Sequence, residues 1–203
     1  MYIDLSVPIN NKTPIYPGDP ETKIEPAGVL ERDGYADSYV SIGTHVGTHV
    51  DAPTHMVAGG KTLDQIPVEQ FIGRGRYVKV ENKTFDLIVV QEAGVQAGDI
   101  VLFDTGLAVN YHEASYFEDY PALPEDIANY LVETNVKMVG FDMCSPDHEP
   151  YPIHKILLGG NVLIIENLTN LEQLAGKDFT IYALPVNLQI DGAPARVIAV
   201  VNN

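Results

Sequence analysis

The sequence has little that suits an oxidising compartment, a membrane or a nucleic-acid partner. Its 203 residues include a single cysteine, Cys144, which cannot form an internal disulfide. No run approaches the ~20 apolar residues of a membrane-spanning helix, and the first residues lack the basic start and apolar core of a signal peptide. Only 12 basic residues stand against 28 acidic ones, for a formal net charge of −16. Because such a surface repels phosphate groups, we expect no nucleic-acid or membrane partner. The single cysteine and the missing signal-peptide pattern predict a cytoplasmic location.

Motifs of nucleotide binding and of serine hydrolases are also missing. The glycines at 73–75 and 159–160 complete neither G-x-G-x-x-G nor G-x-x-x-x-G-K-[ST], so a nucleotide site is unsupported. No serine lies in a G-x-S-x-G elbow. Cys144 has no basic neighbour in the sequence to activate it, and a small buried residue is the better interpretation.

The residues that are present predict one mixed α/β domain over residues 1–203. Apolar residues make up 45% of the chain and charged residues 20%, which is ordinary for a globular protein, and glycine and proline form no linker. Runs rich in β-branched and aromatic residues predict strands at 1–6, 39–46, 76–80, 100–104, 136–141, 161–165, 179–183 and 196–201. Helix signals are clearest at 124–134 and weaker at 62–71, 85–93, 152–158 and 170–174. Because strands outnumber helices and alternate with them, we expect a large sheet, whose strand order the sequence leaves open.

The segment SIGTHVGTHVDAPTHM, residues 41–56, holds His45, His49, Asp51 and His55. Glycine and β-branched residues disfavour a helix, so we expect a strand on which residues 45, 49 and 51 point to one side. In a straight strand residues four apart are separated by ~13 Å, whereas nitrogens that bind one metal each lie ~2 Å from it. We therefore expect a bend at Gly47, where the missing Cβ permits a bulge or a turn. A lone histidine is more often an ordinary core or surface residue, but the whole set predicts a metal site.

Imidazole together with carboxylate suits zinc, manganese or iron(II) and is too rich in nitrogen for calcium. Because the set has no cysteine ligand, open coordination positions and catalysis are favoured over a closed structural zinc site. Further along, Glu166 follows directly after the apolar residues 161–165, and His154 begins the same stretch of sequence. The residues alone leave open whether these two side chains are ligands.

The run HVGTHVDAPTH, residues 45–55, resembles the H-x-G-T-H-x-D-x-P-x-H signature of the metal-dependent cyclase family, which includes bacterial kynurenine formamidases and isatin hydrolases. The resemblance covers essentially the whole chain. It includes the opening segment DLSVPINNKTPIYPGDP and the H-x₁₁-E spacing of His154 and Glu166. It implies a domain of the swivelling β/β/α type that assembles as a homodimer or homotetramer.

By matching position, the resemblance implies two divalent metal ions per chain, with zinc favoured and manganese as the alternative. His45, His49 and Asp51 would hold the first ion. Asp51 would also reach the second ion, His154 would bind it, and Glu166 would touch both. His55 would be the general acid/base. Two ions ~3.5–4 Å apart bring the pKa of a bridging water to near 7. The metal-bound hydroxide would attack a carbonyl carbon, and His55 would pass the proton to the leaving amine.

The substrate implied by the resemblance is a small amide, and the leading activity is that of an arylformamidase. Such an enzyme converts N-formylkynurenine to kynurenine and formate in tryptophan catabolism. Tyr16 occupies the position where the family's kynurenine formamidases have a tryptophan against the substrate, and tyrosine can still stack on an aryl ring. Two other functions stay open: hydrolysis or cyclisation of another small carbonyl compound, such as the lactam isatin, and metal-dependent binding without catalysis. A protein of the last kind would be expected to lack His55.

Residues outside these sets give weaker signals. The loop FDMCSPDHEP follows a predicted strand, where site residues often lie, and it holds Asp142, Ser145, Asp147 and His148. We expect His148 to be an ordinary loop residue. His112 lies either in a lid over the site or in an exposed loop, and Arg74 and Arg76 are more simply surface charges than contacts for an acidic substrate.

Overall fold

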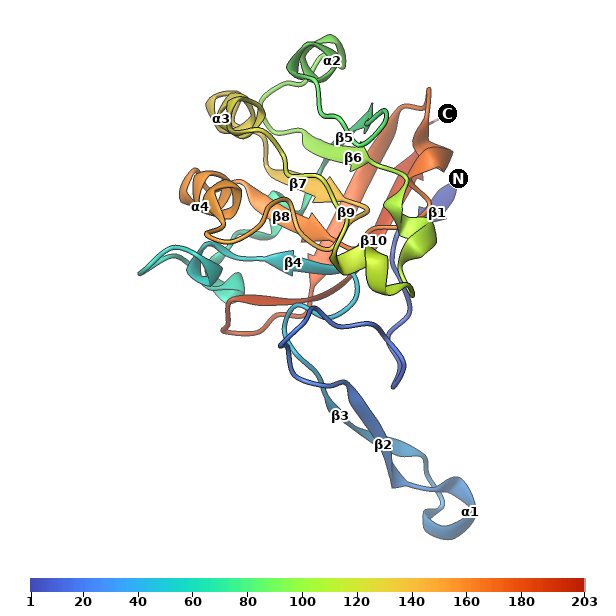
Figure 1. Ribbon diagram of the computed structural model, residues 1–203. Coiled ribbons are helices and arrows are strands. Elements are labelled where there is room, and N and C mark those ends of the chain that lie inside the picture. The colour runs from blue at the N-terminus through green and yellow to red at the C-terminus, as the bar shows by residue number, and fades with distance from the viewer. Residues whose placement is uncertain (203) are drawn as a thin grey trace.

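The computed structural model describes residues 1–202 and is built around one large sheet. Its strands are β1 (Tyr2–Asp4), β4 (His49–Asp51), β5 (Ile72–Lys79), β6 (Ile100–Asp104), β7 (Met138–Phe141), β8 (Leu163–Glu166), β9 (Phe179–Pro185) and β10 (Gly192–Val201). These 8 strands are ordered β1-β10-β4-β8-β7-β6-β5-β9, and β9 also pairs with β10 (Figure 1). The sheet therefore closes into a ring of all strands but β1, which pairs with β10 alone. Strands β5 to β8 are parallel to one another, and the remaining pairs are antiparallel.

Three helices cover the outer face of the parallel strands: α2 (Leu87–Glu92), α3 (Glu125–Glu133) and α4 (Pro152–Gly159) (Figure 1). Acidic side chains in the first turn of α3 favour its N-terminus, and Ile127 and Leu131 are buried on its inner side. Short 3₁₀ turns complete the chain at η1 (Pro53–His55), η2 (Leu63–Gln65), η3 (Val68–Phe71), η4 (Leu107–Asn110), η5 (Ala114–Phe117) and η6 (Leu171–Leu174). No helix in residues 1–202 is long and apolar enough to cross a membrane.

The core lies on both faces of the sheet, which explains why the parallel strands are apolar throughout. In β6, Ile100 and Leu102 belong to the cluster that fills the ring. The alternate residues Val101 and Phe103 belong to the cluster beneath the helices. Because β7 and β8 are anchored on both faces in the same way, their carboxyl ends provide a rigid edge for a site.

One segment leaves this body altogether. Strands β2 (Lys23–Gly28) and β3 (Asp37–Ser41) pair only with each other, and the short helix α1 (Leu30–Asp33) caps the hairpin. We call residues 23–41 the arm. It extends away from the body in Figure 1, and every residue of β3 is exposed.

The strand-rich α/β class predicted from the sequence is confirmed, but several elements differ. The strand expected over 39–46 is wrong in its second half, because β3 ends at Ser41 and residues 44–48 form turns. Strand β2 was not among the predicted strands. Pro26 within it lacks a backbone donor, and the pairing with β3 shifts register between Pro26 and Gly28. The helices expected at 62–71 and 170–174 are 3₁₀ turns.

Candidate metal centre and active site

Strand β4 carries two of the predicted ligands into the middle of the sheet. It lies between β10 and β8, and the antiparallel register places His49 opposite Glu166 and Asp51 opposite Gly192. His49 and Asp51 are fully buried. The pairing of β4 with β8 thus explains how two residues far apart in the sequence come together.

His45 reaches the same point from a turn and not from a strand. Gly47 adopts a φ of +62°, and a Cβ there would lie 2.9 Å from Cγ1 of Ile9, so the position requires glycine. This confirms the predicted bend at Gly47. The turn brings Nδ1 of His45 to 2.8 Å from Oδ1 of Asp51. The same Asp51 oxygen lies 3.3 Å from Nε2 of His49.

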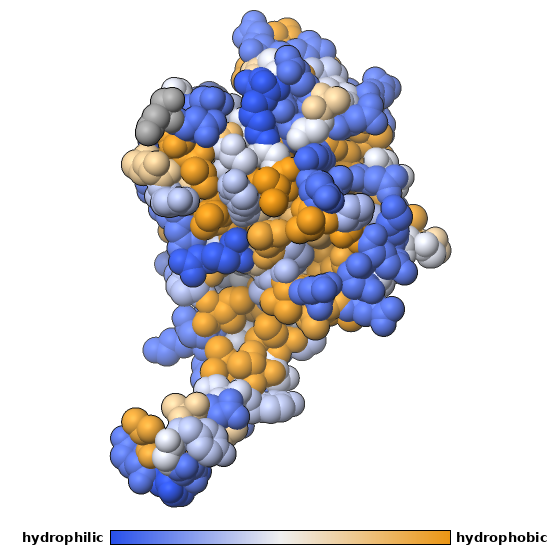
Figure 2. All heavy atoms as spheres, turned by 180° about the vertical axis from the view of Figure 1, so that it is seen from behind, coloured by the Kyte–Doolittle hydropathy of each residue, from blue (hydrophilic) through white to orange (hydrophobic). Residues whose placement is uncertain are grey.

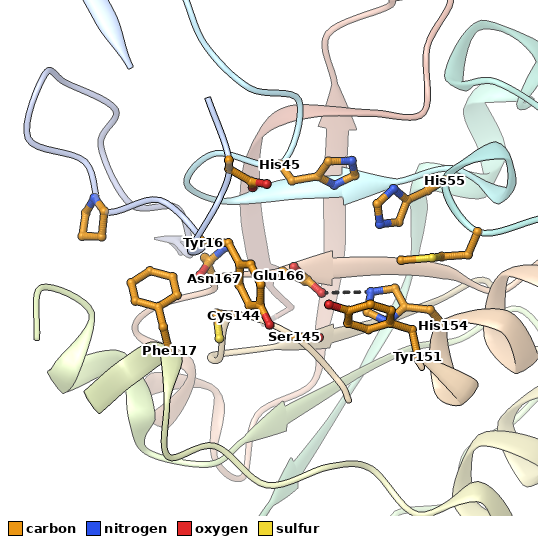
Figure 3. A pocket seen from close by; sticks show the side chains of 13 residues that line it. Tyr16, His45, His55, Phe117, Cys144, Ser145, Tyr151, His154, Glu166 and Asn167 are labelled. Carbon is orange, nitrogen blue, oxygen red and sulfur yellow. Dashed lines mark ion pairs between the residues drawn. The ribbon is translucent and has the colours of Figure 1, made fainter. Parts of the chain in front are cut away.

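The second group of predicted ligands lies against the first. His154, in α4, places Nε2 3.4 Å from Oε1 of Glu166 (Figure 3) and 3.9 Å from Oδ2 of Asp51. The other oxygen of Glu166 is 3.2 Å from Nε2 of His49. Glu166 therefore lies between two histidines and Asp51 among three, so that either carboxylate could be shared by the two groups of predicted ligands.

Buried polar atoms without partners show that this cluster fits a cation. Nε2 of His49, Oδ2 of Asp51 and Oε1 of Glu166 are buried and make no hydrogen bond. Nearly all buried polar atoms in folded proteins are paired, so three orphaned atoms at one place call for a missing partner. Ligand atoms of His45, His49 and Asp51 also lie within 4.8 Å of one another. A divalent metal held by these residues would give the buried atoms partners.

The ring nitrogens that face away from the centre have acceptors. Nδ1 of His49 lies 2.8 Å from the backbone oxygen of Gly47, and Nδ1 of His154 lies 2.6 Å from Oδ1 of Asp147. The other oxygen of Asp147 accepts a hydrogen bond from the backbone N–H of Ile153 in the first turn of α4, at 2.6 Å. Such partners fix the orientation of the ring, so that the opposite nitrogen is free to bind a metal.

The carboxylates strongly affect the charge of the histidines. Burial lowers the pKa of His154, but its hydrogen bond to Asp147 and the negative charges of Glu166 and Asp51 outweigh this effect and raise the pKa to about 10. In the same way, Asp51 and Glu166 raise the pKa of buried His49 well above its usual value. The carboxylates therefore favour the protonated form of both rings in the metal-free protein, and a metal that binds there would have to displace a proton.

His55 lies beside this cluster but in a different environment. It ends η1, directly after β4, and its ring centroid is 4.0 Å from that of His45 and 5.7 Å from that of His154. Burial lowers the pKa of His55, and the attraction of Asp51 is opposed by repulsion from His45 and His154. A neutral imidazole next to a metal centre can accept a proton.

A pocket with a volume of about 180 Å³ opens onto these residues (Figure 3). It is lined by Pro14, Tyr16, Asp19, His45, His55, Met56, Phe117, Cys144, Ser145, Tyr151, His154, Glu166 and Asn167. The ring of Tyr16 meets that of Phe117 edge to face at 6.2 Å, and its hydroxyl lies 3.3 Å from that of Tyr120. None of the described lining residues is a lysine or an arginine. The pocket therefore has the aromatic rings of Tyr16 and Phe117 on one side and His55 and His154 on the other (Figure 3).

The structure shows which of the residues with weaker sequence signals line the pocket and which lie elsewhere. Ser145 and Cys144 line the pocket, and burial raises the pKa of the Cys144 thiol, as expected for an unreactive cysteine. Asp142 instead holds the loop after β6 through Thr105. His148 packs on Tyr120, and His112 is exposed. Arg74 and Arg76 both pair with Asp99.

Sequence reasoning missed four residues of the site. Phe117 and Tyr151 line the pocket, and Asn167 donates a hydrogen bond to the backbone oxygen of Gly47 at 3.0 Å. Asp191 lies 2.8 Å from Nε2 of His45. Asn167 adjoins Glu166 in the sequence, which is a signal that could have found it, but the other three have none.

Comparison with known sequences identifies a protein family that matches this chain. The model of the family described as "Putative cyclase" matches residues 3–148. A kynurenine formamidase of Bacillus thuringiensis (strain Al Hakam) is 29% identical over 204 residues, covering 97% of this chain and 96% of that protein.

Solved structures agree with the sequences. A potential metal-dependent hydrolase with cyclase activity is 30% identical, with a TM-score of 0.82 over 98% of this chain and 96% of that one. Isatin hydrolase A from Ralstonia solanacearum is 25% identical, with a TM-score of 0.85 over 98% of this chain and 91% of that one.

Proposed function

The chain belongs to the cyclase family, and from that membership we propose that it is a metal-dependent hydrolase of a small amide, acting on a C–N bond other than a peptide bond. The observation that carries the proposal is the cluster of three buried atoms without hydrogen-bond partners, on His49, Asp51 and Glu166, of which Glu166 lines an open pocket. A set of such ligands beside a substrate-sized pocket is typical of a catalytic metal site.

The residues divide into two ligand groups. His45, His49 and Asp51 would hold one ion, and Asp51, His154 and Glu166 a second. Zinc suits this mixture of imidazole and carboxylate best, and manganese is the alternative. When bound, such ions supply Lewis acidity that activates water and polarises a carbonyl group.

His55 would move the proton. The oxygen of the attacking water bonds to the carbonyl carbon while His55 accepts the proton of that water. His55 then donates the proton to the nitrogen of the leaving group as the C–N bond breaks, which gives a carboxylic acid and an amine. A ring nitrogen of His55 lies within 4.8 Å of ligand atoms of Asp51 and His154, close enough to serve a carbonyl bound at the centre.

The leading substrate is an aryl formamide. Tyr16 and Phe117 line the pocket and offer aromatic surface against which an aryl ring can pack. The similarity of this chain to a kynurenine formamidase supports the proposal of arylformamidase activity. In that reaction N-formylkynurenine would give kynurenine and formate.

The composition of the pocket supports a second candidate substrate, a lactam such as isatin. N-formylkynurenine is a zwitterion, and the described lining residues include Asp19 for its α-ammonium group but no lysine or arginine for its α-carboxylate. Isatin is uncharged and needs no such partner. The structural likeness to an isatin hydrolase agrees with this alternative.

Both substrates can be tested on one preparation. We expect metal-loaded protein to hydrolyse at least one of N-formylkynurenine and isatin, followed by the absorbance of the product, and a chelator to abolish the reaction. If the metal-loaded protein hydrolyses neither these two compounds nor a panel of simple formanilides and lactams, the hydrolase proposal is wrong.

Three broader predictions accompany this function. We propose that residues 1–203 form a single domain of the swivelling β/β/α type, which the closed sheet with helices on one face supports. We also propose a cytoplasmic location and a small molecule as the substrate. The acidic charge of −16 and the single cysteine support the location.

We further propose a homodimer or homotetramer in which the arm contacts another copy of the chain. Two-stranded hairpins are marginally stable alone, yet among the described residues β2 and β3 pair only with each other, and Ile24 exchanges hydrogen bonds with the side chain of Asn11 near the body. Leu30, Tyr35, Tyr39 and Val40 are more than half exposed on it. In Figure 2, apolar residues gather where the arm joins the body and recur at its tip.

Substitutions in the arm test this assembly. We expect Tyr39→Asp combined with Val40→Asp to convert the oligomer into monomers, because charges replace the exposed apolar contacts. Sedimentation velocity measures the change. Val109→Asp is the control, since Val109 is 86% exposed on η4 in the body, and this variant should sediment like the parent protein. Unchanged sedimentation of the arm variant would contradict an arm-mediated interface.

A further inference from the structure

Asp191, at the end of the loop between β9 and β10, contacts both of the histidines at the rim of the site. Its Oδ2 lies 2.8 Å from Nε2 of His45 and 3.6 Å from Nδ1 of His55. The rings of His45 and His55 lie next to each other on one side of the pocket, facing His154 and Glu166 (Figure 3). One oxygen of Asp191 therefore contacts both His45, a predicted ligand, and His55, the predicted acid/base.

The backbone around Asp191 fixes its position. Gly192 pairs with Asp51 in β4, and the backbone oxygen of Asp191 accepts a hydrogen bond from Ala52 at 2.8 Å. The hydroxyl of Thr44 donates to Oδ2 of Asp191 at 3.3 Å. A Cβ on Gly192 would lie 2.7 Å from Cε1 of His45, so glycine at this position leaves room for the ring. These contacts tie the carboxylate to the strand that carries the metal ligands.

His45 needs such a partner more than the other predicted ligands do. His49 is set by strand β4, and His154 by helix α4. His45 comes instead from the turns at residues 44–48, where no ladder of backbone hydrogen bonds fixes the side-chain direction. The hydrogen bond from Nε2 to Asp191 turns the opposite nitrogen, Nδ1, toward Asp51.

We propose that Asp191 is a positioning residue that orients His45 for metal binding and keeps His55 beside the pocket. The proposal rests on the proposed function, because it assumes that His45 is a metal ligand. Asp191 does not line the pocket, so it acts through the two histidines and not on the substrate. Carboxylates behind metal-bound histidines typically contribute 10–100-fold to metal affinity or activity.

The test compares zinc affinity in three variants, measured by competition with a chromophoric chelator. We expect Asp191→Ala to weaken zinc binding by about 10–100-fold. Asp191→Asn keeps an oxygen that can accept the hydrogen bond from His45, so it should recover part of the loss. Asp178→Ala removes a carboxylate that contacts the side chain of Asn202, outside the site, and should bind zinc like the parent.

A kinetic measurement separates positioning from a general structural role. At saturating metal, Asp191→Ala should lower kcat and leave KM nearly unchanged, because the pocket lining is intact. The thermal midpoint of the metal-free variant should stay close to that of the metal-free parent, which excludes misfolding as the cause.

The possible outcomes distinguish this inference from the proposed function. If the parent protein binds zinc and is active, while Asp191→Ala shows the same affinity and the same kcat, the role of Asp191 is overturned and the hydrolase proposal stands. If the parent binds no divalent metal, both are overturned. A graded loss of affinity from parent through Asn to Ala supports Asp191 as the positioning residue.

Discussion

Replacing His55 with alanine should lower turnover by about 100-fold or more while leaving the metal content near that of the parent protein. The reason is its location, because His55 follows strand β4 in η1, beside the cluster and facing the open pocket. Its pKa is lowered by burial, so that near neutral pH it is available to accept a proton. Steady-state kinetics on the metal-loaded variant, together with metal analysis of the same sample, measures both quantities.

The control for this substitution is His112→Ala, which removes an exposed histidine outside the pocket and should retain full activity. The informative contrary result is loss of metal from His55→Ala. A ring nitrogen of His55 lies within 4.8 Å of ligand atoms of Asp51 and His154, so His55 as a ligand is a concrete alternative. Loss of metal would establish that alternative and end the acid/base assignment.

Replacing Glu166 with glutamine should lower metal affinity by about 100-fold or more, beyond the range typical of residues that act behind a ligand. Glutamine keeps the shape of the side chain but removes the negative charge and leaves a weaker ligand. Glu166 lies between His49 and His154, so one substitution weakens both predicted ion sites. His49→Ala should show a similar loss, because it removes Nε2, a fully buried nitrogen that makes no hydrogen bond and lies between Asp51 and Glu166.

Metal occupancy after dialysis, measured by plasma mass spectrometry, checks these two variants. Glu172→Gln is a matched control, since Glu172 is an exposed glutamate on η6. Full occupancy in either Glu166→Gln or His49→Ala would remove that residue from the ligand set.

The sequence was most informative where local pattern and burial agree. The predicted strand at 100–104 matches β6, because its four buried apolar residues, 100–103, belong to apolar clusters on both faces of the sheet. The predicted helix at 124–134 matches α3, which has acidic residues at its start and one apolar side. Strand β2 was missed because the arm has no apolar face against the body, so no alternation marks it.

The site likewise has features that could be predicted from local sequence and features that could not. The bend at Gly47 could be predicted, because only a bend brings His45 and His49 to one metal. The link from β4 to Glu166 depends on strand pairing across more than a hundred residues, and only the family resemblance indicated it. Asp191 could not be predicted, since nothing near it in the sequence shows that its loop returns to His45. The roles of these residues as ligands stay a prediction.

The most direct test of the account is the metal content of the protein purified without chelator, measured together with its turnover of N-formylkynurenine and isatin. The account predicts about two zinc or manganese ions per chain, as expected for a paired site, and hydrolysis that stops when a chelator removes them. A protein that holds no divalent metal, even after reloading, would contradict the metal centre and the hydrolase function built on it.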